Sequence, residues 1–528
     1  MLSPPKRQRH ATCRPNARQV HNEEAMMDTG PQDKPQWMRW ALAVLLLCCL
    51  VGLAPAKAAS ERLRIGIPLE PASFDITSTS AATASEITYA NVFEGLTIID
   101  GQGQIKPRLA QSWTVSQDGK QVDMVLRRQV RYHDGKPFNA ATAAFSLQRL
   151  LQMKNTNAYL EWFDKLVSVE AVDEYLLRIR LSEPDALLSY ALAMPGAVMV
   201  HPDSAASNAS APVGTGPYQV EKWTKGKSIT LLRNEQWWDS KKPAIRMADF
   251  LFMSSAAETE NMLAEGRIDA LSSVTRLTAS FMARTDYVMG QRGVEGKLLI
   301  AMNNARAPLN DIRVRRAINH ALDRSRYQDI YGGSIEVLPI GSHFSPHHRA
   351  YVDLVQRYPY DPAQAKALLA QAQVAPGPSL RLAVPPTDYG RYGSLIVAAQ
   401  LEAIGLQVEI IRMDWPTWLD QVMKRKDYDL SLIMHVEPMD IGIYARDDYY
   451  FQYNNRVFKK IWEKLRASAS PQELDDWLGQ AQRQLAEDAV NAFIVVRPER
   501  NFMRKGLVGM WSQCPIPTFA LEDLRWQN

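Results

Sequence analysis

Apolar residues recur at helical spacing in two segments of the C-terminal half of the chain. One segment follows Asn310 and Asp311, either of which can cap a helix. The other begins at Ser470-Pro-Gln-Glu473, a capping-box sequence with Pro at the first helical position. The two apolar stripes are Val314, Ala317, Ile318, Ala321 and Leu322, and Leu474, Trp477, Leu478, Ala481 and Leu485. Both are typical of helices that pack one face on a core.

Between these two segments, predicted strands and helices alternate. Apolar runs at 380–384, 408–413 and 429–436 predict strands, whereas 395–404, ended by Gly405, and 418–423 predict helices. A β-α-β-α-β series favours a parallel sheet with right-handed crossovers. The pattern therefore predicts an α/β fold.

The first 58 residues differ from the rest of the chain. An apolar run of 14 residues at 41–54 follows Arg39 and precedes Ala56-Lys-Ala58. Such a run is typical of a cleaved secretory signal peptide, and it is shorter than the roughly 20 residues of a membrane span. We therefore expect a soluble mature protein that begins near Ala59 and resides in the periplasm. The alternative, a lipid anchor on Cys48 or Cys49, lacks the small residue expected before such a site.

Charge and cysteine content change when this leader is removed. The chain carries 61 Lys and Arg against 57 Asp and Glu, and the leader holds eight of the basic and four of the acidic residues, so the remainder is balanced. No charge excess then favours nucleic acid or an anionic membrane as a partner. Only Cys514 of the four cysteines lies beyond the leader, which excludes an intrachain disulfide in the mature chain.

A series of motifs runs in order through the mature chain. The most distinctive is Val213-Gly-Thr-Gly-Pro-Tyr218, followed by Trp223 and Trp237-Trp-Asp239. On its own this segment predicts a hairpin, because its Gly and Pro residues mark a turn before a short apolar strand at 229–232. Further motifs occur at 89–96, 106–110, 132–138, 266–269, 310–324 and 360–369. In this order they resemble the extracellular solute-binding proteins, family 5, of peptide- and nickel-importing ABC transporters.

The resemblance implies a two-lobed periplasmic-binding-protein fold, type II-like, with an inserted domain and a hinge. It assigns residues 59–104, 205–300 and 490–528 to the first lobe, 105–204 to the inserted domain, and 301–489 to the second lobe. It implies a monomeric component of an ABC importer that encloses a peptide, a conjugate or a metal chelate and delivers it to an inner-membrane permease. A sensory or chaperone-like binding protein on the same fold is the alternative. Neither interpretation involves a cofactor.

No segment predicts an enzyme. The Gly214-Thr-Gly216 segment lacks the third Gly and the acidic residue of a dinucleotide site, and no G-x-S-x-G, P-loop or H-E-x-x-H motif occurs. The cluster of His343, His347 and His348 is expected on a solvated loop. A metal site that uses His343, His347 or His435 is the alternative, and the sequence assigns no metal ligand set.

Ligand contacts are expected at the ends of the strands in the second lobe, because open α/β sheets bind ligands beyond their carboxyl edges. This places His435, Glu437 and Asp440 in the predicted site. The next segment, 441–453, holds five aromatic rings and three charged residues, and it forms either a pocket wall that includes Tyr444 or a cover over the core edge.

Arg391 lies just before the predicted helix at 395–404. Some peptide-binding relatives place an Arg near this position to hold the ligand carboxylate, and a planar guanidinium suits that task. The alternative is an exposed loop Arg with no ligand.

One position departs from the family. Peptide-binding relatives carry an Asp three residues before an acidic-Pro pair, and this Asp holds the amino terminus of the ligand. Here the pair is Glu437-Pro438 and the matching residue is Met434, whose thioether cannot neutralise an ammonium group. We therefore expect a modified peptide, an opine-like conjugate or a metal chelate, and not an ordinary free-amine peptide. The alternative is that Glu437 or Asp440 supplies the charge.

Overall fold

Three sheets organise the chain in the computed structural model, which describes residues 61–78, 81–153, 160–274, 281, 283–331, 337–374, 379–497 and 499–527. The predicted leader, residues 1–58, lies outside the described residues. Within the described residues, no helix combines the length and the apolar character that a membrane span needs.

The first sheet has seven strands drawn from distant parts of the sequence. β1 lies between β10 and β11 and runs parallel to both, whereas the other pairs are antiparallel. The order is β12 (Tyr287–Arg292), β19 (Glu499–Arg504), β11 (Ala270–Leu271), β1 (Arg62–Ile67), β10 (Met247–Phe252), β9 (Ser228–Arg233) and β8 (Tyr218–Thr224). β8 and β9 form the hairpin that the Gly-Pro turn predicts.

The second sheet has six strands and contains the predicted parallel unit. β15 lies between β16 and β17 and is parallel to both, so the β-α-β-α-β prediction is confirmed. The order is β14 (Leu338–Pro339), β18 (Ala492–Val496), β13 (Lys297–Met302), β17 (Leu430–His435), β15 (Ser379–Val384) and β16 (Gln407–Arg412). This sheet therefore begins before the predicted lobe boundary at 301 and ends after the one at 489.

The remaining strands form smaller sheets. An antiparallel sheet of β4 (Ala110–Val115), β5 (Gln121–Leu126), β7 (Leu176–Leu181) and β6 (Leu166–Asp173) lies within the predicted inserted domain and packs against α4. Two-strand ribbons form from β2 (Thr97–Ile99) with β3 (Ile105–Pro107), and from β20 (Leu507–Val508) with β21 (Arg525–Trp526).

The α-helices of the described residues are α3 (Ala82–Thr88), α4 (Ala140–Gln152), α5 (Leu188–Ala191), α6 (Ala256–Ala264), α8 (Ile312–Ala321), α9 (Pro362–Gln371), α10 (Asp388–Glu402), α11 (Trp415–Trp418), α12 (Arg456–Arg466) and α13 (Pro471–Glu487). Short 3₁₀ segments are η1 (Leu160–Phe163), η2 (Pro195–Ala197), η3 (Arg324–Tyr331), η4 (Val355–Arg357) and η6 (Asp440–Ala445), and η5 (Leu419–Lys424) is a π-helix.

The predicted caps are present, but two helices begin earlier than predicted. Asp311 caps α8, and Ser470 caps α13 by accepting a hydrogen bond from the backbone N–H of Glu473. α10 begins at Asp388 and not at 395. The apolar periodicity missed this start because the first turn of the helix is polar and carries no apolar stripe. The predicted helix at 418–423 starts at Trp415 and continues as the π-helix η5.

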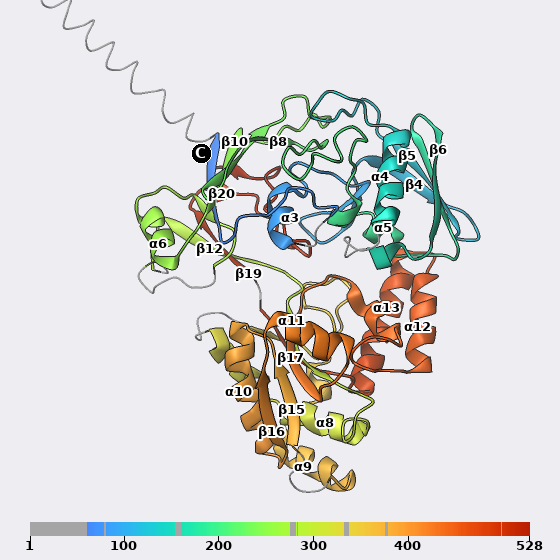
Figure 1. Ribbon diagram of the computed structural model, residues 1–528, viewed down its shortest axis with the longest axis vertical. Helices are drawn as coiled ribbons and strands as arrows, with labels where there is room; N and C mark the ends of the chain where they lie inside the picture. The colour runs from blue at the N-terminus through green and yellow to red at the C-terminus, as the bar shows by residue number, and fades with distance from the viewer. Residues whose placement is uncertain are drawn as a thin grey trace, which may run out of the picture. The chain divides into compact units, whose positions relative to one another are not determined.

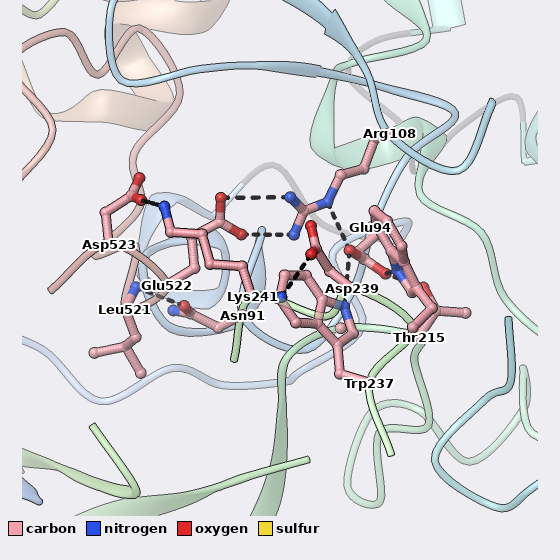
Figure 2. A network of polar contacts seen from close by, with 12 residues as sticks. Asn91, Glu94, Arg108, Thr215, Trp237, Asp239, Lys241, Leu521, Glu522 and Asp523 are labelled. Atoms are coloured by element: carbon pink, nitrogen blue, oxygen red, sulfur yellow. Dashed lines mark hydrogen bonds and ion pairs between the residues drawn. The ribbon is translucent and has the colours of Figure 1, made fainter. Parts of the chain in front are cut away.

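The motif Val213-Gly-Thr-Gly-Pro-Tyr218 connects segments that lie far apart in the sequence. A Cβ added at Gly214 would lie 1.9 Å from the Val92 carbonyl oxygen, so only glycine allows this close approach. The neighbouring Thr215 hydroxyl donates to Glu94 at 2.7 Å, and Arg108 donates to the same carboxylate at 2.6 Å. Figure 2 shows Arg108 held between Glu94 and Glu522. The motif therefore has a structural role.

Candidate ligand-binding site

The carboxyl ends of three parallel strands meet at one edge of the second sheet. β15 ends at Val384, β16 at Arg412 and β17 at His435, and Figure 1 shows these strands side by side with α10 next to them. β13 is antiparallel to β17, and its first residue, Lys297, pairs with His435, so Lys297 lies at this edge too. Strands adjacent in a sheet lie about 4.8 Å apart, which places the ends of β17 and β16 roughly 10 Å apart.

One end of this edge carries two arginines. Arg391 and Arg412 line a cavity of about 310 Å³ between the end of β15 and the start of α10. Both side chains are exposed, and among the described residues neither forms an ion pair. Arg391 lies within the first turn of α10, so its predicted place on a loop before the helix is wrong. The polar first turn that carries it is also the part of α10 that the periodicity missed.

The other end of this edge is a buried polar cluster around Asp440, which is only 9 % exposed. Its Oδ1 accepts hydrogen bonds from Lys297 Nζ at 3.2 Å and from His343 Nε2 at 2.6 Å. Its Oδ2 lies 3.4 Å from Nδ1 of His435, whose Nε2 lies 2.9 Å from the Tyr450 hydroxyl. Burial alone would raise the pKa of Asp440, but Lys297 and His343 hold it well below its usual range.

His343 corrects the expectation of a solvated histidine loop. Its side chain is fully buried, and Ser342 and Ser345 beside it are buried as well. Burial lowers the pKa of His343 to about 4, so the imidazole is neutral at pH 7. In the neutral ring, Nε2–H donates to Asp440 and Nδ1 accepts from the Tyr444 hydroxyl at 3.1 Å. The expectation is therefore wrong for His343, whereas His347 and His348 farther along the loop are half-buried and Pro346 and Arg349 are exposed.

Three of the predicted residues could form a cation site. One ligand atom each from His435, Glu437 and Asp440 lie within 4.8 Å of one another, and this is the one such group among the described residues. His343 and His347 do not belong to it. The Lys297 ammonium already lies in the same corner, because it donates to the Glu437 carbonyl oxygen at 2.8 Å.

The aromatic segment after Asp440 belongs to the core. Tyr444, Tyr450 and Phe451 are each 1 % exposed, and Tyr444 stacks on Phe451 with ring centroids 5.2 Å apart. Of the two interpretations open from the sequence, a cover over the core edge describes these residues. Tyr444 lies beneath the site and orients His343 through its hydroxyl group.

Met434 lies on the opposite side of the sheet from the Asp440 cluster. It is partly buried against the helical side of the sheet, where Leu432 and Leu298 also pack. Its neighbour His435 alternates to the other face, as successive residues of a strand do. A side chain at position 434 therefore points away from Asp440 in this fold.

A second cavity, of about 360 Å³, adjoins the buried cluster on another side. Glu295 lines this cavity and lies 3.8 Å from Lys297 Nζ. Its wall also includes Trp113 and Tyr190 from the region of the four-stranded sheet, His348 from the segment that follows β14, and Leu474 of α13. Burial raises the pKa of the Glu295 carboxyl.

Sequence reasoning missed Lys297, Glu295 and Arg412. The signal for Lys297 was a single charged residue at the start of an otherwise apolar strand, Lys-Leu-Leu-Ile-Ala-Met. Arg412 likewise ends a strand whose carboxyl edge was already the predicted site. No sequence pattern around Glu295 marks it as a site residue, because only the packing of the segment before β13 brings it to the cluster.

Comparison with known proteins agrees with this architecture. The bacterial extracellular solute-binding proteins, family 5 Middle, match residues 104–455. Di/tripeptide-binding protein 2 of Pseudomonas aeruginosa (strain UCBPP-PA14) is 26 % identical over 424 residues, which cover 74 % of this chain and 78 % of that protein. The nickel-binding periplasmic protein of Escherichia coli (strain K12) is 29 % identical over 294 residues, which cover 53 % and 55 % of the two chains.

A solved structure is similar over most of the chain. HbpA2 from Haemophilus parasuis superimposes with a TM-score of 0.79 at 20 % identity, covering 88 % of this chain and 100 % of that chain. The two-lobed family fold expected from the motifs is therefore confirmed, and the relatives are binding proteins, not enzymes. Because the family match extends over more than half of the sequence, this chain belongs to the bacterial extracellular solute-binding proteins, family 5.

Proposed function

We propose that this protein is the periplasmic solute-binding component of an ABC importer, and that it captures a peptide-like or metal-chelate ligand by lobe closure. Relatives named for di/tripeptide and for nickel binding support these two ligand classes. The mature chain begins near Ala59 in this proposal, acts as a monomer, and delivers its ligand to a permease at the inner membrane.

The observation that carries the proposal is the pair of arginines at the carboxyl edge of the second sheet. Arg391 and Arg412 share one cavity and have no ion-pair partner among the described residues. Two guanidinium groups beside the first turn of a helix favour an anionic group, and a carboxylate fits their planar donors. This end of the edge therefore suits the carboxylate of a peptide-like ligand or of a chelating ligand.

In this proposal, some of the remaining site residues contact the ligand and others support those residues. Glu437 is exposed and lies two residues beyond the end of β17, so it can contact the ligand. His435 is 6 % exposed and lies at the rim of the buried cluster. Asp440 and Tyr444 act indirectly: Asp440 holds His435 in place, and the Tyr444 hydroxyl holds His343 in place. The Lys297 ammonium beside Asp440, and not residue 434, which faces the other side of the sheet, favours a ligand without a free α-amine.

Titration calorimetry with two probe classes tests this function. The probes are N-acetylated di- and tripeptides with a free carboxylate, and nickel–histidine. We expect one class to bind with a Kd below about 10 μM, to remain chemically unchanged, and to reduce the radius of gyration of the protein.

Variants test where the carboxylate binds. Arg391→Gln combined with Arg412→Gln should weaken binding at least about tenfold, because the carboxylate loses both guanidinium partners. Lys424→Gln, which removes an exposed charge from η5, should leave the affinity unchanged. Conversion of the probe to another compound, or full affinity in the double variant, would contradict the proposal.

A further inference from the structure

Lys297 is fully buried, although lysine is among the residues least often found inside a protein. Its Nζ donates to the Glu437 carbonyl oxygen at 2.8 Å and to Asp440 Oδ1 at 3.2 Å, and it lies 3.8 Å from Glu295 Oε2. Two hydrogen-bond acceptors and a second nearby carboxylate offset the cost of burying this charge. This corner of the protein is therefore built to hold a cation.

The sheet register brings this ammonium to the ligand-binding edge. Lys297 begins β13 and pairs directly with His435 at the end of β17. The two side chains lie on the same face of the sheet, opposite the face that buries Leu298 and Met434. The tethered cation thus comes from a strand next to the site and not from the loop that follows β17.

Both oxygens of the Asp440 carboxylate already face donors of the protein. Oδ1 receives Lys297 and His343, and Oδ2 faces His435. A ligand ammonium that entered this corner would meet a like charge and would compete for an oxygen that is already bonded. Asp440 therefore does not restore an amine anchor, which was one alternative open from the sequence.

We propose that Lys297 determines the class of ligand: its ammonium group fills the cation position at Asp440, so the site accepts ligands with a neutral or anionic group there and excludes those with a free α-ammonium. This inference rests on the proposed function and adds the residue that sets its specificity. The ligand class is a carboxylate-bearing peptide or conjugate with a blocked amine, or a chelate without an ammonium group.

Calorimetry with alanyl-phenylalanine and its N-acetyl form tests the specificity. We expect the wild-type protein to bind the N-acetyl form at least tenfold more tightly than the free-amine form. Lys297→Gln, which retains a donor for the Glu437 carbonyl, should bind the free-amine form at least tenfold more tightly than the wild type does. Lys297→Arg, which retains the cation, should keep the wild-type preference.

The double variant Lys297→Gln/Asp440→Asn is the matched control. It removes the carboxylate that would receive a ligand ammonium, so the gain of free-amine binding should disappear. Equal binding of both peptide forms by the wild type, or an equal gain in the single and double variants, would overturn the proposal.

A stability measurement separates this inference from the proposed function. If no variant binds either peptide, the ligand class is wrong, but the cation position can still be tested with methylammonium. At equal ionic strength, methylammonium chloride should raise the thermal midpoint of Lys297→Ala relative to sodium chloride, and it should not do so for Lys297→Ala/Asp440→Asn. Folding of Lys297→Ala only with methylammonium would also support the proposal, whereas the same midpoint in both salts would overturn it.

Discussion

Gly214 has a steric role, because its position leaves no room for a side chain. Its backbone lies against the segment that precedes β2, and any Cβ there would collide with the Val92 carbonyl oxygen. Thr215 beside it bonds the buried Glu94, which in turn holds Arg108. At the scale of residues, this motif therefore stabilises the packing around Glu94 and Arg108, and the residues proposed to select a ligand lie elsewhere.

Gly214→Ala should lower the free energy of unfolding by about 3 kcal/mol, because the backbone of two segments must move apart. Gly479→Ala in α13 is the matched control, since its added Cβ comes close to the movable end of Arg483 at 3.1 Å and meets Val352 at an ordinary contact distance of 3.6 Å. The control should be neutral or stabilising by up to about 1 kcal/mol, as expected from helix propensity. Urea denaturation measures both, and equal stability of the two variants would refute the steric role.

His343 predicts how stability depends on pH. Its pKa is about 4 in the folded protein, against about 6.5 in an unfolded chain. The unfolded state therefore takes up a proton first as the pH falls, so stability is present above pH 6.5 and is lost between about 6.5 and 4. This group alone should remove on the order of 2 kcal/mol between pH 7 and pH 5.

Denaturant unfolding at several pH values checks this expectation. His343→Gln should show a smaller loss between pH 7 and pH 5, whereas His320→Gln, on α8 outside the cluster, should behave like the wild type. The contribution of Asp440, whose folded pKa is lowered, is lost only below about pH 4. The same pH slope in His343→Gln and in the wild type would exclude the buried histidine as the cause.

At the scale of elements, the periodic parts of the sequence were predictable and the site was predictable only in part. The parallel unit of β15, β16 and β17 follows from local apolar runs, and the edge where they end is a general consequence of strand direction. The apolar periodicity did not predict the first turn of α10, because that turn is polar. Lys297 and Glu295 reach the site through sheet register and chain crossing, which no local pattern encodes.

The cap of α13 provides a test at this scale. Ser470→Ala removes the side-chain acceptor of the Glu473 backbone N–H and should cost about 1 kcal/mol of stability. Ser470→Asp should retain the cap and most of the stability. Thermal or denaturant unfolding compares the two variants, and an unchanged Ser470→Ala would show that other contacts of α13 satisfy its first turn.

At the scale of the whole described chain, a buried ion pair connects the region of the four-stranded sheet with the end of α12. Arg466 donates to both oxygens of Asp185 at 2.6 and 2.7 Å, and the Ala186 backbone N–H donates to the Arg466 carbonyl oxygen. The Asp185 side chain is only 2 % exposed. The proposed lobe closure has to preserve or rearrange this contact, which lies beside the cavity lined by Glu295.

Arg466→Met should destabilise the protein by about 3 kcal/mol, because it leaves the Asp185 carboxylate buried without its partner. Arg466→Met/Asp185→Leu should recover most of this loss, since neither charge is then buried. Denaturant unfolding gives both values. A single variant as stable as the wild type, or a double variant no better than the single one, would show that the pair contributes little.

Native mass spectrometry of the protein purified from its own periplasm tests the central claim most directly. We predict a non-covalent small-molecule adduct that is released intact on denaturation, and whose fragmentation shows a carboxylate or a bound metal but no free α-amine. Release of an ordinary free-amine peptide would contradict the role of Lys297, and a chemically converted product would contradict a binding function.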